Sequence, residues 1–127
     1  MTRETVHAPG APAAVGPYSH AVRDGDRLYL SGQAPFHPET GQVVEGGIEA
    51  QARQVFANLA AVLDAAGSSF ADVLKVNVYL TDLADFQTVN AIYAEAFTEP
   101  FPARTTIGVA GLPLGAAVEI ELIARAR

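Results

Sequence analysis

The sequence predicts an α+β fold in which two helices cover one face of a sheet of about six strands. Two stretches carry apolar residues at spacings of three and four, and several shorter ones alternate between apolar and polar residues. Two amphipathic helices can cover only one face of such a sheet. The 127 residues are close to the commonest domain size, so we expect a single domain over residues 1–127.

The first expected strands form a hairpin. Proline and glycine are frequent up to Tyr18, which indicates an extended or irregular start. Residues 19–33, SHAVRDGDRLYLSGQ, then hold two short runs on either side of Asp24-Gly25, a dipeptide typical of hairpin turns. Another turn is expected at residues 37–43, HPETGQV, and a further short strand before the first helix brings the number to about six.

Two helices follow from the spacing of apolar residues. The first is expected from Ile48 to Ala66, where Gly67 is a stop signal. The second is expected from about Leu83 to Phe97, with Asp82 as its N-cap and an apolar stripe that faces the core, formed by Phe86, Val89, Tyr93 and Phe97.

The remaining strands are expected at residues 72–82, 104–111 and 116–126. Alternation in the first of them turns Leu74, Val76, Val78 and Leu80 toward the helices and Lys75, Asn77 and Tyr79 away. In the last strand it turns Val118, Ile120 and Leu122 toward the helices and Glu119, Glu121 and Ile123 away. A second face that mixes aromatic, aliphatic and polar groups favours self-association.

Composition excludes several classes of function. The absence of cysteine rules out disulfides, zinc–thiolate sites and a cysteine nucleophile. The net charge is −6, and the basic residues, seven arginines and Lys75, are scattered, so we expect no nucleic-acid partner. No apolar run approaches membrane-spanning length, which makes a cytoplasmic location the expectation. The histidines His7, His20 and His37 lack ligand spacing, and no metal or cofactor is expected.

Several stretches together resemble the RidA family (YjgF/YER057c/UK114), small proteins known for enamine and imine deamination. They include GPYSHAV at 16–22, YLSGQAPFHPETG at 29–41, FPARTTIGVAGLP at 101–113 and VEIELIA at 118–124. The ordered combination of GPY, SGQ, TVN, PAR and EIE extends over essentially the whole chain. The resemblance implies a six-stranded mixed sheet like that of Bacillus-type chorismate mutase. It also implies a homotrimer whose sheets line a central barrel, with active sites between neighbouring subunits.

The resemblance also assigns two catalytic residues. Arg104 of the PAR segment matches the residue that binds the substrate carboxylate, a task that suits the planar fork of a guanidinium. The alternative for Arg104 is a structural ion pair at the start of a strand. Glu119 matches the glutamate that acts on the hydrolytic water. Periodicity alone does not choose between Glu119 and Glu121, which share a face.

Tyr18, Ser31, Gly32, Asn90 and Thr106 match substrate-binding positions of the family. Gly32 is equally consistent with a strand bulge, and Asn90 with an ordinary polar position on a helix. Thr106 stands where a cysteine is frequent, and the family uses the backbone carbonyl there to help hold the water. His20 stands where glutamine is common, which is expected to alter the rim of the pocket.

The activity that this resemblance implies is hydrolysis of reactive 2-imino acids, such as 2-iminopropanoate and 2-iminobutanoate, to 2-keto acids and ammonia. A related deaminase acting on aminoacrylate or aminomuconate is one alternative. The other is a non-catalytic trimer that binds ligands or inhibits translation.

Overall fold

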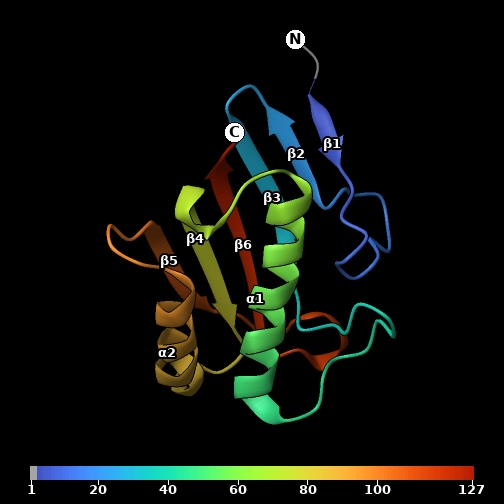
Figure 1. The fold of residues 1–127 in the computed structure, drawn as a ribbon. Coiled ribbons are helices and arrows are strands. Elements are labelled where there is room, and N and C mark those ends of the chain that lie inside the picture. The colour runs from blue at the N-terminus through green and yellow to red at the C-terminus, as the bar shows by residue number, and fades with distance from the viewer. Residues whose placement is uncertain (1–2) are drawn as a thin grey trace.

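The structure describes residues 3–127, and within them a mixed sheet of six strands carries two α-helices on one face. In this computed structural model the strands lie in the order β1-β2-β3-β6-β4-β5 (Figure 1). Neighbours are antiparallel, apart from β4 and β5, which are parallel and joined through α2. The α+β fold predicted from the sequence is confirmed. The elements are β1 (Glu4–Val6), β2 (Ala21–Asp24), β3 (Arg27–Gln33), α1 (Gly47–Ala65), β4 (Val73–Leu80), α2 (Phe86–Ala96), β5 (Ala103–Gly108) and β6 (Val118–Arg125).

The sixth strand comes from a different place than expected. It is β1, in the opening segment, which pairs with β2. Between β3 and α1, where a short strand was predicted, only an isolated bridge joins Phe36 to Val43. Pro35 and Pro38 lie in this segment, and a proline has no N–H to donate to a strand ladder, so the pairing does not extend.

The end predicted for α1 is present, whereas α2 begins at Phe86, three residues later than predicted, with Asp85 in place of Asp82 at its N-cap. Gly67 adopts a φ of 75° after α1 and donates its N–H to the Asp64 carbonyl, while Ser68 donates to Leu63. This pair of bonds is the Schellman arrangement. The Asp82 carboxylate accepts a hydrogen bond from the Ala84 N–H and so caps a 3₁₀ turn, Leu83–Asp85, that leads into α2.

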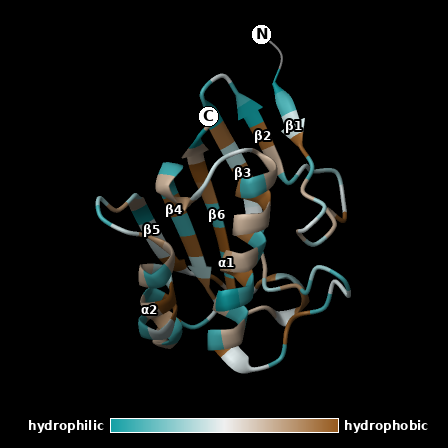
Figure 2. Cartoon of the chain, in the orientation of Figure 1, coloured by the Kyte–Doolittle hydropathy of each residue, from teal (hydrophilic) through white to brown (hydrophobic). Residues whose placement is uncertain are grey.

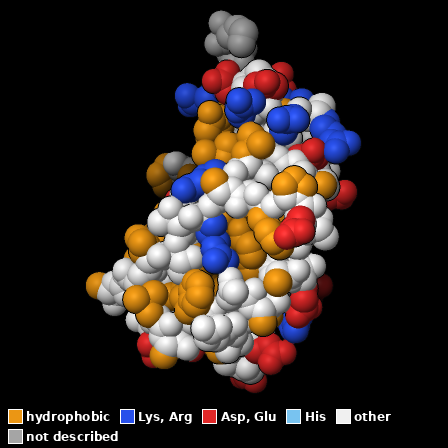
Figure 3. Space-filling view, turned by 90° about the vertical axis from the view of Figure 1, so that its left-hand side faces the viewer, with side chains coloured by type: hydrophobic (Ala, Val, Ile, Leu, Met, Phe, Trp, Pro, Cys, Tyr) orange, Lys and Arg blue, Asp and Glu red, His pale blue; other side chains and the backbone are white. Residues whose placement is uncertain are grey.

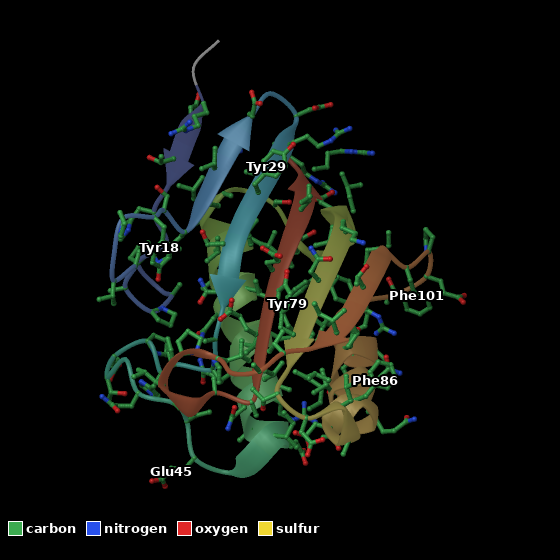
Figure 4. All side chains as sticks on the ribbon, turned by 180° about the vertical axis from the view of Figure 1, so that it is seen from behind. Tyr18, Tyr29, Glu45, Tyr79, Phe86 and Phe101 are labelled. Atoms are coloured by element: carbon green, nitrogen blue, oxygen red, sulfur yellow. The ribbon has the colours of Figure 1, made fainter. Side chains whose placement is uncertain are left out.

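The apolar stripes of both helices face the sheet (Figure 2), and the core lies between the two layers. The uncovered face of the sheet is turned toward the viewer in Figure 4, where Tyr79 lies on it. Leu74, which was expected to face the helices, does not lie in the core, because the β4–β6 register shifts between Val73 and Lys75. The resulting irregularity buries Val73 in the core in place of Leu74.

A buried asparagine fastens the segment after β3 to α1. Asn58 is 1% exposed, and its Nδ2 donates to the carbonyls of Ala34 at 3.2 Å and Phe36 at 3.0 Å. Its Oδ1 accepts from Gln54 Nε2 at 2.8 Å. Because buried carbonyl groups need partners, this side chain fixes the path of residues 34–36.

Replacing Asn58 with alanine is expected to lower the free energy of unfolding by about 2 kcal/mol, since the buried carbonyl of Ala34 and the partly buried carbonyl of Phe36 lose their donor. Urea denaturation at one fixed protein concentration measures the change. Gln54→Ala is the matched control, because it removes only the outer bond of the same network and should cost less. Equal losses in the two variants would contradict the role given to Asn58.

Candidate active site

A cleft of about 830 Å³ opens where β3 and β6 meet the loops of residues 12–18 and 34–41. Four of the predicted site residues line it: Tyr18, Ser31, Gly32 and Glu119. Tyr18 is half exposed on the loop side of this cleft (Figure 4). Apolar walls come from Pro12, Val15, Phe36, Pro38, Pro113 and Leu114. We call this space the Glu119 cleft.

The Glu119 carboxylate lies against the backbone of Gly32. A Cβ on Gly32 would overlap Glu119 Oε2, at a separation that real Cβ atoms essentially never show, and would stand 3.1 Å from Glu119 Cδ. The β3–β6 register also shifts between Leu30 and Gln33, so a strand irregularity is present at the same place. Glycine is therefore needed at this position for the approach of Glu119, where the sequence had suggested room for a ligand.

The hydrogen bonds distinguish the two glutamates that periodicity could not. Glu121 Oε1 accepts from the Tyr79 hydroxyl and, at 3.4 Å, from Asn77 Nδ2. The side-chain carboxylate of Glu119 accepts no hydrogen bond from any group in residues 3–127. Burial raises the pKa of the Glu119 carboxyl above its ordinary value, and the charge of Glu121 raises it further. Glu119 is therefore the carboxylate that is available to a water or substrate in the cleft.

Two inner residues hold the walls of the cleft. The Ser31 hydroxyl donates to the Ser19 carbonyl at 2.6 Å, which joins β3 to the loop that carries Tyr18. His20 was expected at the rim but is only 2% exposed. Its Nδ1 accepts from the Ala8 N–H at 2.9 Å, so Nε2 carries the proton and donates to the Pro12 carbonyl at 2.8 Å. His20 thus shapes the rim indirectly, by holding Pro12.

Arg104 lies elsewhere, in a cleft of about 420 Å³ between β5 and α2. Its Nη1 donates to Asn90 Oδ1 at 2.7 Å. The guanidinium carbon lies 4.6 Å from the centre of the Tyr93 ring and 5.6 Å from that of Phe86. Figure 3 shows this side of the molecule, where single basic side chains stand among apolar patches.

The alternative reading of Arg104, a structural ion pair, is not what the structure has. Among residues 3–127, no carboxylate lies within ion-pair distance of Arg104. The side chain is exposed, and Asn90 occupies one of its nitrogens. A guanidinium that is held in place but keeps donors open is suited to an incoming anion.

One chain does not bring Arg104 and Glu119 together. Arg104 pairs across the sheet with Val76, which is buried beneath the helices. Glu119 pairs with Tyr79 on the uncovered face. The two side chains therefore leave opposite faces of the sheet and line different clefts.

Thr106 lines neither cleft, although it follows Arg104 by two residues on the same face of β5. It pairs with Val78 of β4, and its hydroxyl is buried without a hydrogen-bond partner among residues 3–127. The role expected for its backbone carbonyl stays a prediction. Sequence reasoning missed two features: Tyr79 as the partner of Glu121, and the Tyr93 ring beneath Arg104. Alternation had placed Tyr79 on the correct face, whereas the helical spacing marked Tyr93 only as core.

Residues 3–127 offer neither a metal site nor a helix that could span a membrane. Within this range, no three His, Asp or Glu side chains are grouped as a metal site would require. Neither helix formed by these residues has the length and apolar character needed to cross a bilayer.

Known proteins similar to this chain match it along nearly its full length. The family model described as Endoribonuclease L-PSP matches residues 8–126. A RutC family protein of Pyrococcus horikoshii is 47% identical over 122 residues, covering 96% of this chain and 97% of that protein. The human 2-iminobutanoate/2-iminopropanoate deaminase is 44% identical, and the alignment covers 98% of this chain and 90% of the human protein. The solved structure of RidA from a Psychrobacter species has a TM-score of 0.92 at 50% identity and covers 96% of this chain, with 98% of its own chain matched.

Gly32→Ala should displace the Glu119 carboxylate, because the new Cβ and Oε2 cannot occupy the same space. The atom that must move is the end of a flexible side chain, so the free energy of unfolding should change by less than about 1 kcal/mol. A crystal structure of the variant and its denaturation curve measure both effects. An unmoved carboxylate, or global unfolding, would contradict this account of the glycine.

Proposed function

We propose that this chain, which belongs to the endoribonuclease L-PSP family that includes RidA, is an imine deaminase. Its substrates would be 2-imino acids such as 2-iminopropanoate and 2-iminobutanoate, which it hydrolyses to 2-keto acids and ammonia. A relative that is 44% identical is named for this reaction. The observation that carries the proposal is the unpartnered Glu119 carboxylate above Gly32 in an open cleft.

Glu119 is proposed as the general base. An imine carbon is electrophilic, more so when its nitrogen is protonated, and a positioned water attacks it. Glu119 takes one proton from that water as the carbon–oxygen bond forms. Glu119 then returns that proton to the nitrogen of the tetrahedral intermediate, which loses ammonia as the carbonyl of the keto acid forms and the carbon–nitrogen bond breaks. One water is consumed for each ammonia released.

Arg104 is proposed to bind the substrate carboxylate. Its open nitrogens can form a bidentate pair with two carboxylate oxygens, which fixes the orientation of the imine carbon. Asn90 and the Tyr93 ring hold the guanidinium in one position before substrate arrives. Tyr18 and Ser31 would complete the wall on the side of Glu119.

These roles require residues from two copies of the chain, because Arg104 and Glu119 leave opposite faces of one sheet. We therefore propose a homo-oligomer in which Arg104 of one copy reaches the Glu119 cleft of its neighbour. Tyr29 is 46% exposed and Ile107 47% exposed on the uncovered face, which gives a second copy apolar surface to cover. A head-to-tail contact of this kind closes into a ring, and the homotrimer expected from the family resemblance is the ring we propose. The cytoplasmic location stays a prediction.

The proposed benefit to the cell is protection. Pyridoxal-phosphate-dependent dehydratases release enamines that become reactive imines, and faster hydrolysis shortens the life of these species. Aminoacrylate or aminomuconate would fit the same pair of charged groups and are the alternative substrates. A ligand-binding trimer without turnover is the remaining alternative.

The basic residues, which are scattered in the sequence, lie partly together in the fold. The expectation that they would be dispersed is therefore wrong for some of them. Arg27 stands opposite Arg125 in the β3–β6 register, and basic side chains collect at one end of the molecule in Figure 3. Carboxylates lie among them, since Asp26 pairs with Arg27 at 3.1 Å and Asp72 with Arg127 at 2.8 Å. With a net charge of −6, we still expect no nucleic-acid partner.

Wild-type protein should accelerate imine decay when a threonine or serine dehydratase generates the imine and keto acid is followed. Glu119→Gln should lower kcat by about 100-fold or more, because the general base is lost. Arg104→Ala should mainly raise KM, and Arg104→Lys should recover only part of the loss, since an ammonium lacks the planar fork.

Arg53→Ala is the matched control for the loss of an arginine. Arg53 is exposed and pairs with Glu95 of α2 at 3.0 Å, outside both clefts, so its activity should equal that of the wild type. No acceleration by the wild-type protein, or full activity in Arg104→Ala, would overturn the proposed function.

A further inference from the structure

Glu121 and Tyr79 stand beside the proposed base, and the hydrolysis described above makes no use of them. Glu119 and Glu121 are alternate residues of β6, so their side chains leave the same face about 7 Å apart along the strand. Both line the Glu119 cleft. Tyr79 is the cross-strand neighbour of Glu119, yet its hydroxyl donates to Glu121. Asn77, the neighbour of Glu121, donates to the same oxygen.

The two carboxylates differ in the hydrogen bonds that they accept. Two donors hold Glu121 in one orientation, whereas Glu119 has no donor among residues 3–127 and can exchange a proton with water. We propose, on the basis of the function proposed above, that Glu121 is a positioning residue. Its carboxylate, fixed by Tyr79, is the negative charge that makes Glu119 a stronger base toward the attacking water.

Other charged or titratable groups face this region without neutralising the pair. They are Lys75 and Tyr79 of β4, Arg27 and Tyr29 of β3, and Tyr18 and Glu39 of the loops around the cleft. Lys75 Nζ donates to Thr105 Oγ1 at 3.0 Å, and Arg27 pairs with Asp26. Within residues 3–127, no cation lies within ion-pair distance of Glu119 or Glu121. Within one copy, the repulsion between the two carboxylates is therefore not cancelled by a direct partner. The Arg104 that a neighbouring copy would bring into this cleft is the same in every variant below, so a difference between variants reports the charge of Glu121.

The ionisation of the neighbours is consistent with this division. The hydrogen bond to Glu121 raises the pKa of Tyr79 to about 12, so Tyr79 keeps its proton and remains a donor at physiological pH. Burial, and then the charge of Glu121, raises the pKa of the Glu119 carboxyl. A carboxylate with a raised pKa accepts a proton from water more readily.

The test is a ¹³C NMR titration of the Glu119 side-chain carboxyl, assigned by its loss in Glu119→Gln. Glu121→Gln keeps an oxygen for the Tyr79 hydroxyl and removes the charge, so the midpoint of Glu119 should move to lower pH. Glu121→Asp keeps the charge and should leave the midpoint above that of Glu121→Gln. Tyr79→Phe removes the hydrogen-bond donor and keeps both carboxylates, so the Glu119 midpoint in this variant should also stay above that in Glu121→Gln.

The proposal also predicts the direction in which the pH dependence of kcat/KM shifts in Glu121→Gln. The base must be deprotonated to act, so the acid limb of kcat/KM in Glu121→Gln should shift to lower pH with the NMR midpoint. At neutral pH its kcat should fall while KM stays unchanged, because Arg104 is untouched. A role in stability alone would move neither the limb nor the midpoint.

A Glu119 midpoint in folded Glu121→Gln that equals the wild-type value would overturn the inference. If Glu121→Gln does not fold, Glu121→Ala removes the same charge and takes its place, and a Glu119 midpoint equal to the wild-type value in that variant would overturn the inference as well. The titration needs no substrate, so a wild-type protein that hydrolyses no imine would count against the proposed function without changing the titration result.

Discussion

Side chains of a strand alternate between the two faces of a sheet, and this chain has helices for only one of those faces. The apolar residues of β4 and β6 lie on the covered face, where the helices bury them. The polar residues of these strands lie on the uncovered face: Asn77, Tyr79, Glu119 and Glu121. The same alternation places Arg104 on the covered side, at the free edge of β5. The separation of Arg104 from Glu119 is thus a consequence of the pleat, and an assembly of copies is the way to join them.

Within each half of the site, a few contacts fix a functional group without neutralising it. Asn90 and two aromatic rings hold Arg104 but carry no opposite charge. Gly32 lets Glu119 lie against the strand without a hydrogen-bond donor to stabilise its charge. The partly buried Glu119 carboxylate is costly for a chain that only has to fold, because it has lost water without gaining a donor, and the exposed Arg104 guanidinium keeps donors open for an anion. An incoming carboxylate and an incoming water would supply the missing partners.

Much of this could be predicted from the sequence, because the signals are local. Helical spacing located α1 and α2, Gly67 marked the end of α1, and alternation set the faces of β4 and β6. The predictions were wrong where pairing depends on distant segments. The position of β1 depends on β2, and the irregularity at Leu74 arises from the register with β6. The family motif selected Glu119 over Glu121, but the physical difference between the two, the Tyr79 contact of Glu121, was not visible in the sequence. The burial of His20 likewise depends on Ala8 and Pro12, which no pattern within one segment reports.

The most direct test of a site shared between copies is complementation between two inactive variants. Arg104→Ala and Glu119→Gln protein would be mixed in equal amounts, unfolded together, refolded and assayed for imine hydrolysis. If each site takes Arg104 from one copy and Glu119 from its neighbour, random assembly leaves about a quarter of the sites intact and restores about a quarter of wild-type activity. Activity no higher than the mean of the two separate variants would contradict the shared site.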